Sequence, residues 1–401
     1  MSVDAIAAEV LAALRERDGH RRMRVVDGAQ GPRMRVDGRE VLLFAGSNYL
    51  DLAYHPEVVE AAARAARELG CASGGSRLIN GNTALHEELE QELAKFLDRE
   101  SALAFATGYM ANLGAIPSLV GPGDRILSDA LAHASVVDAC RLSRAELSVL
   151  PHGDVGAFEV ELRAHARPGR RLLVAVDGVY SMDGDLAPLR ELVPLAKRWG
   201  ALVLLDDAHG TGTLGASGRG SAELCGVESE VDVVTGTLGK ALGSFGAFAA
   251  GSRGLRELLV NVARPFIFTC ALPPPQVAAA RAALRLVAAE PWRRAQLQAR
   301  AARLRERLAA HGISTEPSRS QIVPVVIGAS AAAMAVCERL LARGFYTQGI
   351  RHPSVPHGTA RLRVTPMATH AEAEIDALAD AIAEELRALP PAQTATCMTR
   401  S

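Results

Sequence analysis

A lysine stands among small residues in the segment VVTGTLGKALG, residues 233–243. Lys240 follows an apolar run that predicts a buried strand, and its neighbours Thr237, Gly239 and Gly243 leave room for a planar ligand beside the amine. Removal from water lowers the pKa of a lysine, and the neutral amine is the nucleophile that forms Schiff bases. Covalent catalysis by Lys240 is one interpretation, but the pattern alone favours a lysine at a loop tip or against a phosphate group, so further residues must decide.

Further polar residues come shortly after other apolar runs of the chain. They are Gly108, Tyr109, His133, Asp177, Ser181, Asp206 and His209. In an open α/β sheet, ligands bind at the carboxyl ends of the strands. A single polar residue at a strand end is more often a cap, but five such groups along one sheet edge predict a site.

Asp206 strengthens the interpretation of Lys240. This carboxylate ends the apolar run ALVLL, where it needs a partner. Enzymes that bind pyridoxal 5′-phosphate (PLP) through a lysine pair the ring nitrogen with an acidic side chain. Asp206 could instead cap a turn, and His133 and His209 could be core histidines with satisfied hydrogen bonds, so the residues alone leave these alternatives open.

Seven short apolar runs after residue 100 alternate with helical stretches. Apolar strands separated by helices indicate the α/β class, with a mostly parallel sheet covered on both faces. We expect a large α/β domain over residues 42–285, preceded by an N-terminal segment over 1–41. A small α+β domain over 286–390 should contain the strands QIVPVVIG and ARLRVTP, and the polar tail 391–401 is expected to be disordered.

Composition and charge argue against several classes of protein. The 401 residues carry a formal net charge of −1, without the clustered Lys and Arg of a nucleic-acid-binding protein. No apolar stretch is long enough to span a bilayer, and the N-terminus lacks the features of a secretory signal. The six cysteines have no spacing typical of a metal site or a disulfide framework, so we expect a cytoplasmic protein without bound metal.

The segment GTGTLG, residues 210–215, fits the GxGxxG pattern of dinucleotide-binding proteins. That motif must open a helix, with an acidic residue about twenty positions later. Here more glycines follow, and Asp206 and Asp207 precede the motif instead. A nicotinamide or flavin site is therefore not expected.

Several blocks of the sequence resemble the α-oxoamine synthases, which are PLP-dependent enzymes of fold type I. The blocks include DDAHGTGTLGASGRG, TGTLGKALGSFGAF, GGSRLINGNTALHEELE, TGYMANLGAIPSLV, GVYSMDGDLAPL and VPHGTARLRVTPMATH. The resemblance covers nearly the whole chain and implies an aspartate aminotransferase-like fold with a seven-stranded sheet. ARPFIFTCALPPPQ and IRHPSVPHGTARLRVT are most similar to the branch that condenses L-alanine with a pimeloyl thioester, pimeloyl-CoA or pimeloyl-ACP, in biotin synthesis.

The resemblance implies four catalytic residues. Lys240 would bind PLP as a Schiff base and later act as general base at the substrate Cα. Asp206 would pair with the pyridine nitrogen and make the ring an electron sink. His133 would stack on the ring, and His209 would form a hydrogen bond with its 3′-oxygen.

The remaining cofactor residues are also implied by the resemblance. Ser181 belongs to the cofactor site, and Gly108, Tyr109 and Thr237 would bind the phosphate through backbone N–H groups and hydroxyls. Thr269, in FTCALPP, would reach the phosphate of the cofactor in a partner subunit. The resemblance therefore implies a homodimer with shared active sites.

At the substrate end, the resemblance implies that Arg363 clamps the amino-acid carboxylate, for which a guanidinium fork is suited. Arg21 would lie at the entrance for the acyl substrate. Ser47 stands where many relatives carry an asparagine that contacts the bound substrates, and a shift of one residue would give this role to Asn48 instead. Ser354 stands where the most similar relatives carry threonine.

These departures from the family pattern, together with Asp51 in place of a glycine, leave the amino acid and the acyl group open. The alternative is a relative that uses glycine or serine, such as the 2-amino-3-ketobutyrate CoA ligase type or an enzyme of secondary metabolism. An aminotransferase would share the fold. A catalytically silent homologue would be expected to lack Lys240 or His133, and both are present.

Overall fold

The computed structural model describes residues 1–16 and 18–390, so the predicted disordered tail, 391–401, lies outside the described residues. The chain forms two compact units. The large unit holds residues 47–181 and 185–295, and the described residues of the small unit are 1–16, 18–46, 182–184 and 296–390. The domain boundaries expected from the sequence stay a prediction.

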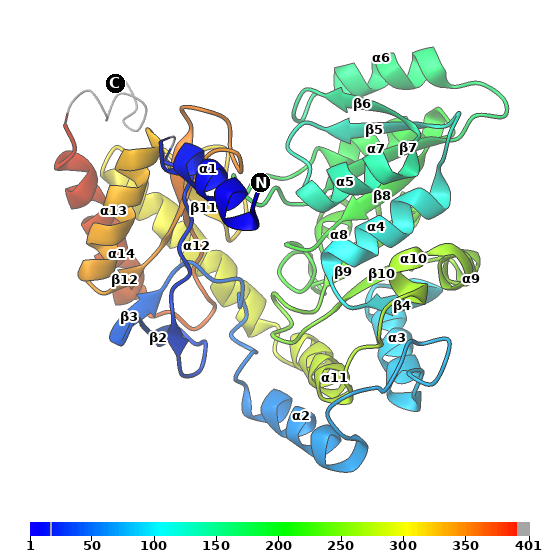
Figure 1. Ribbon diagram of the computed structural model, residues 1–401, viewed down its shortest axis with the longest axis horizontal. Coiled ribbons are helices and arrows are strands. Elements are labelled where there is room, and N and C mark those ends of the chain that lie inside the picture. Colours follow the sequence, from blue (N-terminus) through cyan, green and yellow to red (C-terminus); the bar gives the residue numbers. More distant parts are fainter. Residues whose placement is uncertain (17, 391–401) are drawn as a thin grey trace. The chain divides into compact units, whose positions relative to one another are not determined.

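A seven-stranded sheet with the order β4-β10-β9-β8-β7-β5-β6 forms the centre of the large unit (Figure 1). Its strands are β4 (Ser101–Phe105), β5 (Arg125–Asp129), β6 (Glu146–Leu150), β7 (Leu172–Asp177), β8 (Leu202–Asp206), β9 (Val233–Thr237) and β10 (Ala247–Gly251). Only β10 runs antiparallel to its neighbours. The predicted α/β class and mostly parallel seven-stranded sheet are confirmed.

Helices of the large unit cover both faces of this sheet, and others pack on those helices. They are α2 (Pro56–Leu69), α3 (Ala84–Phe96), α4 (Gly108–Leu119), α5 (Ala134–Ser143), α6 (Val155–His165), α7 (Leu189–Arg198), α8 (Ser221–Cys225), α9 (Arg253–Val262), α10 (Arg264–Ile267) and α11 (Pro274–Ala289), with a 3-10 turn at Glu228–Glu230. Leu173 and Ala175 of β7 pack into one core with α4, α5, α9 and α10. Successive residues of a strand face opposite sides, so Val174 and Val176 face the side covered by α6 and α7. Burial on both faces explains the uninterrupted apolar strands.

The register of the sheet brings the strand ends to one edge. Asp177 at the end of β7 pairs with Asp206 at the end of β8. Phe105 and Thr237, which end β4 and β9, both pair with Ala247 of the strand between them. The segments that follow β4, β9, β8, β7 and β5 therefore all start from the same edge.

The small unit contains two short sheets. One has the order β1-β2-β3-β12 and the other the order β11-β14-β13. The strands are β1 (Val26–Asp27), β2 (Arg33–Val36), β3 (Arg39–Leu43), β11 (Val323–Gly328), β12 (Phe345–Tyr346), β13 (Gln348–Ile350) and β14 (Ala360–Val364). The helices are α1 (Val3–Glu16), most of α12 (Trp292–Ala310), α13 (Ser330–Ala342) and α14 (Glu372–Arg387). In the part of the chain that the structure covers, no helix combines the length and apolar character needed to cross a membrane.

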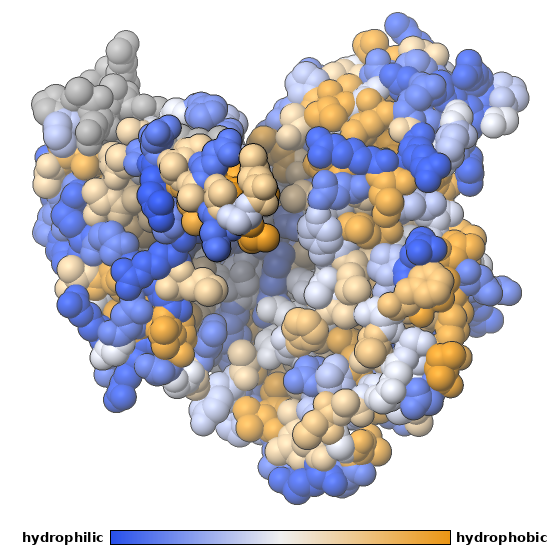
Figure 2. Space-filling model, in the orientation of Figure 1, coloured by the Kyte–Doolittle hydropathy of each residue, from blue (hydrophilic) through white to orange (hydrophobic). Residues whose placement is uncertain are grey.

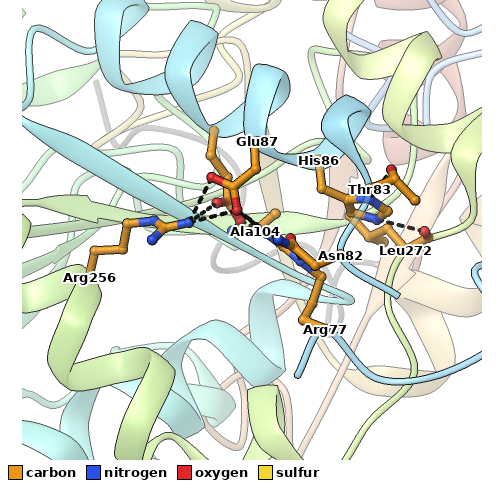
Figure 3. Close-up of polar contacts among 9 residues, drawn as sticks. Arg77, Asn82, Thr83, His86, Glu87, Ala104, Arg256 and Leu272 are labelled. Carbon is orange, nitrogen blue, oxygen red and sulfur yellow. Dashed lines mark hydrogen bonds and ion pairs between the residues drawn. The ribbon is translucent and has the colours of Figure 1, made fainter. Parts of the chain in front are cut away.

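A buried ion network in the large unit surrounds Glu90 on α3, and Figure 3 labels its partners Arg77, Arg256 and Ala104. The side chain of Glu90 is 3% exposed. It accepts hydrogen bonds from Arg77 at 2.6 Å, from Arg256 at 2.8 Å and from the Ala104 N–H on β4 at 2.9 Å. Three donors compensate the cost of removing this carboxylate from water.

The network fastens the loop 73–83 to the loop 268–273. His86 Nε2 donates to the Leu272 carbonyl at 2.9 Å, and the Ala271 N–H donates to the Gly75 carbonyl at 3.0 Å. The Arg77 guanidinium also lies over the ring of Phe266, 5.6 Å from its centroid. The second loop carries Thr269, so these contacts beside the ion network help to hold the loop of this predicted cofactor residue.

The change Glu90→Gln should lower the free energy of unfolding by about 3 kcal/mol, because it leaves the Arg77 guanidinium, whose side chain is 6% exposed, without its main carboxylate partner. A matched control is Glu88→Gln on the same helix, whose partner is Arg281 and whose side chain is 49% exposed. A surface pair contributes about 1 kcal/mol or less. Urea unfolding of the two variants measures the difference, and equal losses would contradict the role given to the network.

Candidate active site

Lys240 and His209 meet at the carboxyl edge of the large sheet. Lys240 Nζ lies 2.9 Å from His209 Nε2, and His209 Nδ1 lies 2.8 Å from the hydroxyl of Tyr49. Tyr49 is 1% exposed and is held firmly by the core. The chain of contacts from Tyr49 through His209 fixes the imidazole ring against the amine of Lys240.

Asp206, at the end of β8, has its carboxylate held by two donors. The Asn112 amide donates to Oδ2 at 2.6 Å, and the Ala208 N–H donates to Oδ1 at 3.0 Å. The same amide nitrogen lies 2.9 Å from Ser135 Oγ, which lies 2.7 Å from His133 Nδ1. Asn112 and Ser135 therefore connect two predicted catalytic residues, Asp206 and His133.

Asn112 and Tyr49 are site residues that the sequence analysis missed. Thr235 donates its hydroxyl proton to Asn112 Oδ1 at 2.8 Å, so the amide nitrogen is turned toward Asp206. A carboxylate accepts hydrogen bonds only, which fixes the same orientation. A signal for Asn112 was present, because it lies four residues after Gly108 and residues four apart share one face of a helix.

His133 forms the N-cap of α5, where its Nδ1 accepts the Ser135 N–H at 3.2 Å. The backbone N–H of His133 donates to Asp177 Oδ1 at 3.1 Å. Burial and the charge of Lys240 lower the pKa of His133, against the opposite effect of Asp206. Burial, and then the nearby Asp206, raise the pKa of Asp177 well above its usual range. A neutral imidazole is thus favoured at His133.

The N-terminus of α4 can bind an anion. The helix begins at Gly108, and the Thr107 side chain accepts the Met110 N–H at 3.2 Å. The first N–H groups of a helix have no partner within the helix and attract negative charge. The hydroxyl of Tyr109 donates to Asp138, so Tyr109 can serve an anion here through its backbone only.

The loop that carries Lys240 is closely packed. The Thr237 hydroxyl donates to the Gly246 carbonyl at 3.1 Å and accepts the Gly239 N–H at 3.1 Å. Gly243 has φ +57°, and a Cβ there would lie 2.4 Å from the backbone nitrogen of Ala53. Only glycine fits at this close approach, which fixes the end of the loop.

The glycine-rich segment 210–220 surrounds a protein carboxylate. Asp207 is 1% exposed, and Ser221 Oγ donates to it at 2.6 Å. A Cβ at Gly210 would lie 2.2 Å from this carboxylate, and a Cβ at Gly220 1.6 Å from it. Burial raises the pKa of Asp207 to about 7. These glycines make room for Asp207.

The segment 47–53 forms a tight turn. Asn48 Oδ1 accepts the N–H groups of Leu52 and Ala53 at 3.0 and 3.2 Å, so this oxygen shapes the turn. Asp51 has φ +56°, in the left-handed region that favours glycine and that aspartate also tolerates. The backbone thus accounts for Asp51 at a glycine position. Ser47 is half-buried beside this turn.

Other predicted site residues lie in different parts of the two units. Ser181 is half-buried after Tyr180, and Thr269 is half-buried in the loop held by the ion network. In the small unit, Arg21 and Ser354 line one cavity of about 560 Å³. Arg363 lies on β14, the central strand of its sheet, and is 7% exposed, which argues against a surface charge on an edge strand.

Comparison with known proteins places this site in a family. Residues 39–382 match the model of aminotransferase class I and II. The chain is 52% identical over 372 residues to an 8-amino-7-oxononanoate synthase of Geobacter metallireducens, which covers 92% of this chain and 94% of that protein. The chain belongs to the 8-amino-7-oxononanoate synthase family. The family is PLP-dependent, and the predicted resemblance to α-oxoamine synthases is confirmed.

Solved structures show the same fold. Serine palmitoyltransferase of Sphingomonas wittichii matches with a TM-score of 0.90 at 36% identity, over 96% of this chain and 97% of that chain. A variant serine palmitoyltransferase from S. paucimobilis with a bound PLP–myriocin aldimine matches with a TM-score of 0.90 at 35% identity, over 96% and 97% of the two chains.

The donor set at the sheet edge fits PLP. The Lys240 amine can bind the aldehyde carbon, and the buried Asp206 carboxylate suits a protonated ring nitrogen. The N-terminus of α4 suits the phosphate group. The side chains around Lys240 therefore match the groups of the cofactor by charge and by hydrogen-bonding capacity.

The change Asn112→Asp should weaken the binding of PLP, because it places a second carboxylate against Asp206 and removes the donor that orients it. Residues that orient the ligands of metal sites contribute about 10- to 100-fold to affinity, and we expect a loss of that size. Absorbance titration of the apo-protein with PLP measures it. The control is Asn261→Asp on α9, whose amide contacts the Glu257 carbonyl of its own helix. Unchanged affinity in Asn112→Asp would contradict the assignment.

The change Gly243→Ala should lower the free energy of unfolding by about 2 kcal/mol or more, through the left-handed backbone and the contact with Ala53. Gly239→Ala in the same loop is the control, because a Cβ there would be 3.6 Å from its nearest neighbour. Urea unfolding of the apo-proteins gives both values. If the two variants are equally stable, the close approach at Gly243 does not constrain the loop.

Proposed function

We propose that this chain catalyses the decarboxylative condensation of L-alanine with a pimeloyl thioester to 8-amino-7-oxononanoate, CO₂ and the free thiol, a step in biotin synthesis. The observation that carries the proposal is the contact between Lys240 and His209 at 2.9 Å on the sheet edge that also holds Asp206. Identity of 52% to a synthase named for this product supports it.

We assign the catalytic roles to four side chains. PLP, when bound, supplies the electron sink that stabilises negative charge at the substrate Cα. Lys240 holds the cofactor and, once its amine is released, accepts the Cα proton as general base. Asp206, oriented by its two donors, keeps the ring nitrogen protonated. His209 donates to the ring oxygen while Tyr49 fixes its orientation, and the neutral His133 stacks on the ring.

The remaining cofactor contacts follow from their positions. Gly108 and Tyr109 offer their backbone N–H groups at the start of α4 to the phosphate, and Thr237 would join them by turning its hydroxyl from the Gly246 carbonyl to the phosphate. Ser181 follows β7 at the same sheet edge and would complete the site. Thr269 would serve the partner's cofactor.

The substrates are anionic, and the small unit offers arginines. The cavity around Arg21 and Ser354 also includes the guanidinium groups of Arg15, Arg22, Arg24 and Arg351. This positive lining suits the carboxylate of a pimeloyl group and the phosphates of CoA or an acyl-carrier protein. Arg363 is buried on a separate strand and would clamp the carboxylate of alanine, while Ser47 or Asn48 would contact the bound substrates.

We further propose a cytoplasmic homodimer with shared active sites. Leu78, Ile79 and Phe268 are 50%, 82% and 70% exposed on the two loops joined by the ion network. Apolar residues also reach the surface over α9 and α10 (Figure 2). Exposed apolar side chains of this size are typical of an interface, and a partner on this face would be near Thr269.

A second candidate is a relative that uses serine with a long-chain acyl thioester. The similarity to serine palmitoyltransferase, with a TM-score of 0.90, favours it. The lower sequence identity, 36% against 52%, favours the first candidate.

Steady-state kinetics with L-alanine, glycine and L-serine, each with pimeloyl-CoA or palmitoyl-CoA, should give the highest kcat/KM for alanine with pimeloyl-CoA. The variant Arg21→Gln should raise the KM for pimeloyl-CoA by about 10-fold, the effect of losing one hydrogen bond to a charged group, and leave the KM for alanine unchanged. Arg64→Gln on α2 is the control. The highest kcat/KM with serine and palmitoyl-CoA would replace the first candidate by the second.

A further inference from the structure

His152 lies in the loop between β6 and α6 and bridges two carboxylates of the large unit. Its Nδ1 is 2.8 Å from Asp129 Oδ1, and its Nε2 is 2.7 Å from Asp185 Oδ2. The ring of Tyr180 meets the imidazole edge-on, with the centroids 4.4 Å apart. No role in the proposed reaction uses this histidine.

The geometry requires a charged ring. Ionised carboxylates accept hydrogen bonds only, so both nitrogens of His152 must carry a proton. The charged groups that face the ring are Asp129 and Asp185, and Tyr180 is the other titratable group packed against it. The hydrogen bond to Asp129, then that to Asp185, raise the pKa of His152 to about 10, against the effect of burial.

Each of the two aspartates also contacts a loop of the site, Asp129 through its carboxylate and Asp185 through its backbone. Asp129 also accepts the Leu131 N–H at 2.7 Å, in the short loop that leads from β5 to His133. The Asp185 carbonyl accepts the Tyr180 N–H at 3.0 Å, beside Ser181. One histidine therefore connects the segment before His133 with the residues that flank Ser181.

We propose that His152 is a positioning residue, whose cationic ring ties the loop 130–133 to the pair Tyr180–Asp185 and so fixes His133 and Ser181 for cofactor binding. The inference rests on the cofactor roles proposed above for His133 and Ser181. The bridge from His152 to Asp129 and Asp185 is present in the apo-protein, so it can be tested independently of those cofactor roles.

Two substitutions separate the two contacts. In His152→Asn the amide nitrogen can take the place of Nδ1 and keep the contact with Asp129, and in His152→Gln it can take the place of Nε2 and keep the contact with Asp185. Hydrogen–deuterium exchange of the apo-proteins should rise about tenfold at residues 178–186 in the Asn variant and at residues 130–135 in the Gln variant. His311→Asn, whose amide nitrogen does not take the place of Nε2 and which therefore removes the contact to Asp380 in the small unit, should change neither segment.

The affinity for PLP adds the second readout. It should fall about tenfold in both variants, as expected for residues that orient the groups touching a ligand. Faster exchange with weaker PLP binding supports the proposal. Unchanged exchange in both folded variants would show that the His152 bridge does not hold the two loops. Faster exchange with unchanged PLP affinity would show that the bridge does not position His133 and Ser181 for the cofactor. Neither result depends on which substrates the wild-type enzyme condenses.

The pH dependence of the wild type keeps the proposal testable if the variants do not fold. A pKa raised in the folded state means that the bridge is intact at neutral pH and is lost as the pH rises through about 10. After correction for the intrinsic rate, exchange at residues 130–135 and 178–186 should rise together near that pH. Constant protection of both segments through this range would overturn the proposal.

Discussion

The hydrogen bond from Asn112 to Asp206 fixes where the negative charge of the site lies. At 2.6 Å it joins α4 to the end of β8, and its other contacts reach β9 through Thr235 and α5 through Ser135. Four elements thus meet at one amide group. Because the carboxylate only accepts and the amide has fixed donors, this arrangement allows one orientation of Asp206.

The carboxyl edge of the large sheet carries three neighbouring aspartates, and its chemistry depends on limiting the repulsion between their charges. Asp177, Asp206 and Asp207 lie at the ends of two adjacent strands, where three negative charges would repel one another. Burial raises the pKa of Asp177 and Asp207, so the protonated forms of these two carboxyls are favoured as the pH falls. The glycines around Asp207 bury that carboxyl group and keep it away from solvent. Asp206 is the member of the three that the Asn112 amide presents to a ligand.

The sequence was sufficient to predict the strand ends and most of the residues on them. Parallel strands buried on both faces are uninterrupted apolar runs, so the polar residue after each run is easy to recognise, as for Asp206 and Lys240. Asn112 and Tyr49 could not be found this way, because their partners lie 94 and 160 residues away and the contacts depend on how helix and turn pack. His152 was missed for the same reason, and the strands β1, β12 and β13 were missed because they contain only two or three residues.

The central claim is that Lys240 carries the cofactor, and the chain offers a direct test because it contains only three lysines, Lys95, Lys197 and Lys240. Lys95 is exposed on α3, and Lys197 forms an ion pair with Asp232. Borohydride reduction of the PLP-loaded protein makes a cofactor bound through a lysine amine permanent, and peptide mass spectrometry then locates it. We expect the added mass only on the peptide that contains Lys240. Modification of Lys95 or Lys197 with Lys240 unmodified would contradict it.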